Sequence, residues 1–178
     1  MGRHIVLLRG INLPRHKRIS MPELRGALED AGFGDVKTYV QSGNVVLSGR
    51  ASSNGVARKV ETVIGDRFGL EVDVIVRTRD ELADVVARDP FGEVASEPKR
   101  YQVTFLAAKP DREAVAKLEA AAAGGEQLVA NGRELYSWHP DGIGRSKLAA
   151  LLAGNGSGVT ATARNWTTVT TLLALADE

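Results

Sequence analysis

The sequence predicts an α+β protein made of two ferredoxin-like (split β-α-β) subdomains that pack together. Two observations lead to this prediction: apolar strand-like runs and helical stripes follow in the order β-α-β-β-α-β in both halves, and a glycine-containing turn separates the middle strands of each half. In this topology each half forms an antiparallel sheet of spatial order 4-1-3-2 with its helices on one face.

In the first half, the pattern of apolar residues and turn signals predicts two helices and four strands. Ser20 and Glu23 form a capping box that opens the first helix, and Gly32 ends it. Ser42-Gly43 has the composition of a two-residue hairpin turn. The expected strands are residues 5–8, 36–41, 44–47 and 71–77, and the second helix is residues 55–68.

The second half repeats this order without repeating the residues. Asn131-Gly132 is a strong signal for a hairpin turn between its middle strands. The expected strands are residues 101–107, 126–130, 133–138 and 159–163, and the expected helices are residues 111–123, 146–153 and an additional last helix, 166–176.

Three segments follow from this pattern. Residues 1–77 form the first ferredoxin-like subdomain, and residues 100–178 form the second, with the extra C-terminal helix. Between them, residues 78–99 hold a helix that opens with a Thr78–Glu81 capping box and stops at Asp89-Pro90, followed by a linker with glycine, proline and several charges.

Composition limits the function classes. The chain has 178 residues, a formal net charge of +1 and no cysteine, so thiolate metal sites and cysteine nucleophiles are absent and a strongly basic nucleic-acid binder is excluded. His4, His16 and His139 have no metal-ligand spacing, and we expect neither a metal nor a cofactor. Because no signal sequence or membrane span is visible, we expect a cytoplasmic protein without membrane contact.

The stretch Pro140–Lys147 is the strongest candidate for a ligand site. It follows a strand and opens a helix; its two glycines let the backbone approach a ligand, and Arg145, Ser146 and Lys147 add two charges and a hydroxyl. This combination predicts an anion site, although a plain turn with Ser146 as N-cap has the same composition. A Walker A loop is excluded because the lysine is followed by Leu148.

The predicted topology brings further polar residues together. Residues 9–12 and the hairpin tip 41–44 would share one sheet edge, and residues 142–147 and 162–166 would share an edge of the second sheet. Each group holds an asparagine and an arginine, which suit phosphate or carboxylate. Turn and cap roles explain several of these residues equally well. Beside the glycine loop, His139 is the only local candidate for a general base, and an ordinary histidine at the end of a strand is the favoured alternative.

The same stretches carry a family resemblance. Five motifs in order, Leu7–Asn12, Met21-x-x-Leu24, Thr38–Val45, Gly144–Leu148 and Thr162–Val169, are similar to the bacterial family filed as domain of unknown function 1697. This resemblance implies an α+β fold with ferredoxin-like subdomains and implies no activity, substrate or cofactor. Leu13-Pro14-Arg15 departs from the glycine-rich loop of many members. The family's motif positions hold these candidate ligand-binding residues: Arg9, Asn12, Gln41, Ser42, Asn44, Arg145, Ser146, Lys147, Arg164 and Asn165.

The first functional hypothesis is a site for a small anion, a phosphate ester or nucleotide, in a cleft between the two subdomains. Its charge would be bound by arginines and lysine of the second half, with Asn12 and Asn44 as polar edges. Whether the site is catalytic and how many copies of the chain assemble stay open.

An alternative hypothesis is an RNA or single-stranded nucleic-acid binding module. It requires exposed aromatic residues on the sheets for base stacking, and only Tyr39, Tyr101 and Tyr136 lie on predicted strands. A third hypothesis is a non-catalytic protein that binds a partner through an apolar patch.

Overall fold

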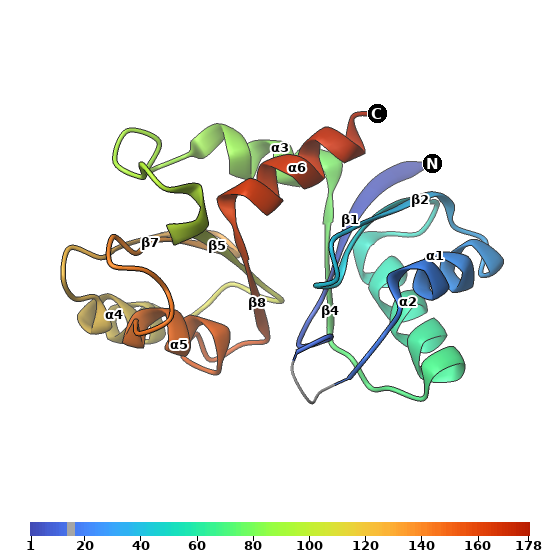
Figure 1. Cartoon of the computed structure of the whole chain (residues 1–178), viewed down its shortest axis with the longest axis horizontal. Helices are drawn as coiled ribbons and strands as arrows, with labels where there is room; N and C mark the ends of the chain where they lie inside the picture. Colours follow the sequence, from blue (N-terminus) through green and yellow to red (C-terminus); the bar gives the residue numbers. More distant parts are fainter. Residues whose placement is uncertain (14–16) are drawn as a thin grey trace. The chain divides into compact units, whose positions relative to one another are not determined.

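The computed structural model of the chain describes residues 1–13 and 17–178 (Figure 1). Contacts divide it into two units: unit 1 comprises Met1–Asp84 and Thr171–Glu178, and unit 2 comprises Val85–Thr170. Both boundaries fall inside helices, α3 (Arg79–Arg88) and α6 (Trp166–Ala176). From the sequence we expect residues 1–77 and 100–178 to form the two subdomains. Which parts of the chain fold independently stays a prediction.

Unit 1 has the predicted order of elements, and its antiparallel sheet has the strand order β2-β3-β1-β4. The ferredoxin-like topology of the first half is therefore confirmed. Helices α1 and α2 lie on one face of the sheet (Figure 1). The elements are β1 (Gly2–Leu8), α1 (Met21–Asp30), β2 (Gly34–Tyr39), β3 (Asn44–Gly49), α2 (Ser53–Phe68) and β4 (Val74–Thr78).

Unit 2 repeats this arrangement, with the antiparallel strand order β6-β7-β5-β8. Helices α4 and α5 pack on one face of its sheet (Figure 1). Its elements are the 3₁₀ helix η1 (Pro98–Arg100), β5 (Tyr101–Leu106), α4 (Arg112–Ala121), β6 (Gln127–Asn131), β7 (Glu134–Trp138), α5 (Lys147–Ala153) and β8 (Ala161–Asn165).

Helix ends follow the predicted local chemistry. The Thr78–Glu81 capping box of α3 is complete: the backbone N–H of Thr78 donates to Glu81 Oε2 at 2.9 Å, and the N–H of Glu81 donates to Thr78 Oγ1 at 3.1 Å. Ser20 caps α1 by accepting the N–H of Glu23 at 3.4 Å. After α2, Gly69 takes φ +65°, the left-handed conformation that suits a C-cap glycine.

The core of unit 1 lies between its sheet and its two helices. Val6 and Leu8 alternate with residues of the opposite sheet face, as strand periodicity requires, and they pack against the apolar stripes of α1 and α2. Leu24 and Val60, one from each helix, are both fully buried. Complete burial of such a side chain stabilises the fold by about 1.5–3 kcal/mol relative to exposure.

In unit 2 an aromatic cluster covers the sheet face opposite α4 and α5. The Tyr101 ring stacks on Trp166, with ring centroids 4.4 Å apart, and meets the edge of Phe91 at 5.6 Å. Phe91 is buried although it lies in the segment that the sequence indicates as linker. The Tyr101 hydroxyl donates to Asp89 Oδ1 at 2.9 Å, so this segment is anchored at two points.

The end of the chain is tied to unit 1. The Arg3 guanidinium donates to the carbonyl oxygens of Leu175 and Ala176 at 3.2 and 3.3 Å, which satisfies acceptors that the last turn of α6 leaves open. Arg79 contacts the Asp177 carboxylate at 2.6 Å. This guanidinium lowers the pKa of the Asp177 carboxyl below its ordinary value through hydrogen bonding.

Two predicted turns are wrong in detail. The first hairpin is closed by the four residues Val40–Gly43 and not by Ser42-Gly43 alone, because Val40 has already left the strand with φ +51°. The second turn has Gly132 and Arg133 at its centre and not Asn131-Gly132, since Asn131 still pairs with Glu134. Gly132 takes φ +56°, as the first central residue of a type II′ turn requires.

We predict that Gly43→Ala destabilises unit 1 more than Gly10→Ala. Both glycines have a positive φ, which costs other residues about 1–2 kcal/mol. A Cβ at Gly43 would also lie 2.9 Å from Leu8 Cβ and 3.0 Å from Ile11 Cγ1, whereas one at Gly10 would have no atom within 4 Å. Such overpacking adds about 1–3 kcal/mol. Urea unfolding of both variants measures the difference, and equal losses would contradict the predicted clash.

Candidate functional site

A buried polar network lies under the glycine loop of unit 2. His139, the residue after β7, is fully buried, and its Nδ1 lies 2.5 Å from Glu126 Oε2. Its Nε2 lies 2.8 Å from Ser137 Oγ. The tautomer that satisfies all three groups has Nδ1–H donating to the carboxylate and Nε2 accepting the Ser137 hydroxyl.

Ser146 joins this network to the start of α5. Its hydroxyl oxygen accepts the backbone N–H of Ala149 at 3.0 Å, which makes it the N-cap, and its hydroxyl donates to Glu126 Oε2 at 2.5 Å. Ser146 therefore occupies one of the backbone N–H groups at this helix end, as expected for an N-cap. The carboxylate that contacts the Ser146 hydroxyl is that of Glu126 and not that of a ligand.

Glu126 is held in its charged form by this arrangement. Burial alone would raise the pKa of its carboxyl, but hydrogen bonds from Ser146, His139 and the backbone N–H of Ala123 together lower the pKa below its ordinary value. A carboxylate that accepts several hydrogen bonds is stable where an isolated one would not be. The network thus fixes the ends of the loop between β7 and α5.

His139 does not fit the role of an accessible general base. Its contacts with Ser137 and Glu126 have the connectivity of a Ser-His-acid triad, but Ser137 and His139 both have 0% exposed surface. A nucleophile must reach its substrate, and this serine lies within β7 under buried neighbours. The structure therefore gives the three residues a positioning role.

Above this network the loop presents cations to solvent. Arg145 and Lys147 are exposed, and Arg100 joins them, since its Nη1 donates to the Pro140 carbonyl at 2.6 Å. Within residues 1–13 and 17–178, none of these three cations has a carboxylate within 4.0 Å. A Cβ built on Gly142 or Gly144 would meet no atom within 4 Å, so the loop backbone is open to approach.

The end of β8 lies at the same sheet edge as this loop, as the topology predicts. Tyr101 pairs with Trp138, and its neighbour Gln102 pairs with Asn165, so β7 and β8 end on either side of the start of β5. Asn165 is the predicted N-cap: its Oδ1 accepts the N–H of Thr168 at 2.9 Å.

Arg164 has structural contacts that the sequence did not suggest. Its Nη1 donates to Thr162 Oγ1 at 2.5 Å and to the Ala163 carbonyl at 2.9 Å. Burial lowers the pKa of Arg164 to about 10, which leaves the guanidinium charged at neutral pH. Arg164 is half-buried, and these two acceptors belong to its own strand.

In unit 1 the two predicted motifs meet, and their asparagines hold the backbone. The Asn12 Nδ2 donates to the carbonyls of Ile19 and Gln41 at 2.9 and 2.7 Å, and its Oδ1 accepts the N–H of Ile19 at 2.8 Å. Asn44 is fully buried, and its Nδ2 donates to the Tyr39 carbonyl and to Ser42 Oγ at 3.2 Å each. Both side-chain amides thus stabilise loops.

The other candidate residues of unit 1 are Arg9, which lies near an acid, and the exposed residues of the hairpin tip. Arg9 is half-buried and lies 3.7 Å from Asp73 Oδ2, whereas Gln41 and Ser42 are exposed. Residues 15–18 hold three cations in the sequence, a pattern typical of a solvated face, and they fall partly outside the described residues. The hypothesis that the candidate residues of both halves serve one ligand stays a prediction.

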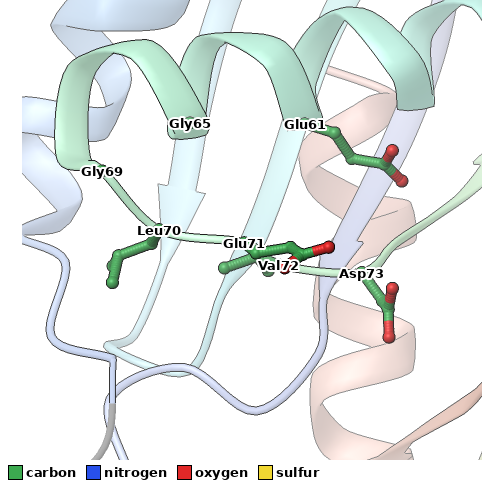
Figure 2. A pocket seen from close by; sticks show the side chains of 7 residues that line it. All are labelled: Glu61, Gly65, Gly69, Leu70, Glu71, Val72 and Asp73. Atoms are coloured by element: carbon green, nitrogen blue, oxygen red, sulfur yellow. The ribbon is translucent and has the colours of Figure 1, made fainter.

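A pocket of about 410 Å³ in unit 1 has the wrong charge for an anion. Figure 2 shows the carboxylates of Glu61, Glu71 and Asp73 around it. Although these acids share one pocket, no group of three or more acidic or histidine side chains in the described part of the chain could hold a metal ion. We therefore place no ligand here.

Two residues of the unit 2 network, Glu126 and Ser137, were not among the candidates predicted from the sequence. The register of β6 and β7 pairs Gln127 with Trp138, so the next positions outward, Glu126 and His139, face each other. A turn centred on Asn131-Gly132 would instead place Glu126 opposite Ser137, so the sequence did not indicate the contact between Glu126 and His139. Ser137 itself carried no signal, because a serine inside a strand has many ordinary explanations.

We predict that Glu126→Gln lowers the free energy of unfolding by about 1.5–3 kcal/mol at pH 7. An amide has one acceptor oxygen, so its NH₂ group would face the donors of Ser146 or His139. Since the folded-state pKa of Glu126 is lowered, its stabilisation is complete above about pH 4.5 and decreases as the pH falls below that value. Chemical unfolding from pH 7 to 3 measures this.

Glu93→Gln is the matched control, because Glu93 is an exposed glutamate of the same unit. If Glu126→Gln and Glu93→Gln lower the free energy of unfolding equally at pH 7, the network does not stabilise the fold.

We predict that Asn12→Asp destabilises unit 1 by about 1–3 kcal/mol, because two carbonyls would lose their donor and face an oxygen. The loss should shrink at low pH, where the aspartate protonates and regains one donor. Thermal unfolding at pH 7 and pH 4 tests this, with Asn54→Asp, an exposed asparagine of α2, as control. A loss that is absent at both pH values would leave Asn12 free for a ligand role.

Comparisons with known proteins identify a family and a fold. The family model for a protein of unknown function, DUF1697, matches residues 1–136. No curated protein matches the chain. A solved structure of the conserved bacterial protein SP0830 from Streptococcus pneumoniae is 19% identical, has a TM-score of 0.78 and covers 98% of both chains, which shows a shared fold. The chain belongs to the DUF1697 family of proteins of unknown function.

Proposed function

We propose that the protein binds a small anionic ligand, a phosphate ester or nucleotide, at the loop that joins β7 to α5. The observation that carries the proposal is the set of exposed cations around this loop, Arg100, Arg145 and Lys147, without carboxylate partners in the described residues. The proposal concerns binding and assigns no reaction.

Charge is the first support for this function. Three cations near one loop repel one another, and an anion between them removes that repulsion. Arginine offers a planar fork of donors to phosphate oxygens, and lysine adds a compact charge. The open backbone at Gly142 and Gly144 lets a phosphate approach the loop without meeting a Cβ.

Preorganisation is the second support. Glu126 and Ser146 fix the loop from below, and Arg100 holds the Pro140 carbonyl, so less conformational entropy is lost when a ligand binds. The short helix α5 contributes little, because its first turn is already capped by Ser146. The side-chain cations therefore carry the proposed recognition.

The nucleic-acid alternative has weaker support. Stacking on bases requires exposed aromatic rings, but Tyr101 is buried against Trp166 and Tyr136 is buried with its hydroxyl donated to the Val85 carbonyl at 2.8 Å. Tyr39 is half-buried at the end of β2. We therefore favour a small ligand over an RNA strand.

We predict that pyrophosphate and adenosine monophosphate bind the wild type and that Arg145→Ala/Lys147→Ala lowers their affinity at least tenfold. Each lost cation removes about 1 kcal/mol of attraction at 4 Å in water. Titration calorimetry at about 20 mM salt measures the affinity, because higher salt screens these charges. Backbone amide shifts in NMR spectra should locate binding at residues 142–147.

The control variant is Arg50→Ala/Arg58→Ala, which removes the same charge from exposed positions of unit 1. Equal affinity in wild type and in the loop variant contradicts the proposal. An equal loss in both variants would also contradict it, since that result indicates a response to net charge alone.

A further inference from the structure

Within the described residues, β6 lacks the bulge and the charged side chains that usually protect an edge strand. β6 pairs only with β7, in a regular register of five residue pairs without a bulge. Its residues, Gln127–Asn131, carry no charge, and Val129 is 37% exposed. Natural proteins protect such edges with bulges, charges or covering loops, because an open edge recruits further strands.

The corresponding edge of unit 1 is protected. β2 has a register shift between Gly34 and Lys37, and Asp35 takes φ +44°. The Asp35 carbonyl accepts a hydrogen bond from Arg3 at 3.1 Å, and Lys37 pairs with Glu178 at 3.2 Å. β2 and β6 thus occupy the same position in the two sheets, and β2 is protected whereas β6 is open.

The hairpin register identifies the backbone groups on the open side. A two-residue turn is closed by a hydrogen-bonded pair, here Asn131 and Glu134. Because such pairs alternate along an antiparallel ladder, Val129 and Gln127 also direct their N–H and C=O groups toward β7. Leu128 and Ala130 therefore direct theirs outward, where an added strand could pair with them.

A groove of about 480 Å³ lies beside the end of this strand. One side is a stripe of α4 at helical spacing, and the other side is the end of β6 and its turn. Its apolar floor has room for a side chain of an added strand. The lining residues are Lys109, Pro110, Arg112, Val115, Ala116, Glu119, Ala130, Asn131 and Gly132.

The groove is basic at the start of α4. Lys109 and Arg112 lie there and have no carboxylate within 4.0 Å in the part of the chain that the structure describes. Asp111, the N-cap of α4, makes no side-chain capping hydrogen bond. A carboxylate of a ligand would meet two cations and the positive end of a helix of ten residues. Glu119 is the only acid that lines the groove, and Asp111 and Glu113 are sequence neighbours of Arg112 outside the lining.

We propose that the groove between α4 and β6 binds an extended acidic peptide of a partner protein by strand addition. The peptide pairs with the outward backbone groups of Leu128 and Ala130, and one of its apolar side chains fills the groove beside Val115 and Ala116. Its carboxylate contacts Lys109 and Arg112. Main-chain hydrogen bonds supply affinity in this mode of recognition, and the groove supplies specificity.

The probe is a phage-displayed library of random peptides of about eight residues, long enough to span a typical strand. It is panned against the full chain, and the enriched peptides are synthesised for affinity measurement by fluorescence polarisation. We expect enriched peptides with alternating apolar residues and at least one Asp or Glu. Hydrogen exchange of the Leu128 and Ala130 amides should slow when such a peptide binds.

Two variants test the contacts separately. Ala130→Pro removes an outward N–H and leaves the ladder with β7 intact, so we expect at least a tenfold loss of affinity. Lys109→Glu/Arg112→Glu should cause a similar loss for acidic peptides. Lys117→Glu, on an exposed position of α4 outside the groove, is the control and should leave affinity nearly unchanged.

Circular dichroism and thermal unfolding show whether each variant is folded. If Ala130→Pro unfolds the protein, Ala130 N-to-O ester substitution by semisynthesis removes the same N–H without the ring. An enriched peptide that binds the edge variant as tightly as the wild type overturns the proposal, and so does a library without enriched peptides. A concentration-dependent dimer that Ala130→Pro dissociates also overturns it, because the occupant would be a second copy of this chain.

Discussion

The central strands β1 and β5 impose the main constraint on this structure. Each pairs with an antiparallel neighbour on both sides over most of its length, and most of its side chains are buried. This pairing decides which segments share one end of a sheet: the loop after β1 contacts the β2–β3 turn, and the loop after β7 starts at the same end of its sheet as the last residue of β8. Within each unit, strand order therefore places the candidate residues at one end of the sheet.

Much of the fold could be predicted from the sequence, because its signals are local. Capping boxes, apolar stripes and turn residues gave the order of elements, and that order fixes the sheet topology. The turns were less predictable. Val40 is β-branched and has a positive φ, which its residue type disfavours, so the loop extends further than the Ser42-Gly43 signal indicates. The pairing of Asn131 with Glu134 moved the other turn by one residue.

The sequence marked candidate residues but not their roles, and it did not mark Arg100 or Glu126. Asn12, Asn44, Ser146 and Asn165 all lie at predicted loop and helix ends, and there their side chains satisfy backbone groups. A residue type that binds a ligand well also caps a helix well, so spacing alone cannot separate these uses. The contact of Glu126 with the loop could be predicted only from the register of β6 and β7.

The return of the C-terminal residues to unit 1 makes unit 2 an insertion in the chain order. Unit 1 is assembled from residues 1–84 and 171–178, with Arg3 and Arg79 holding the last turn of α6 and the residue after it. A ribosome therefore releases the final part of unit 1 only after all of unit 2 has been made. During synthesis all four strands of unit 1 are available before unit 2 is made, and only the contacts of Arg3 and Arg79 with the C-terminal residues form after unit 2.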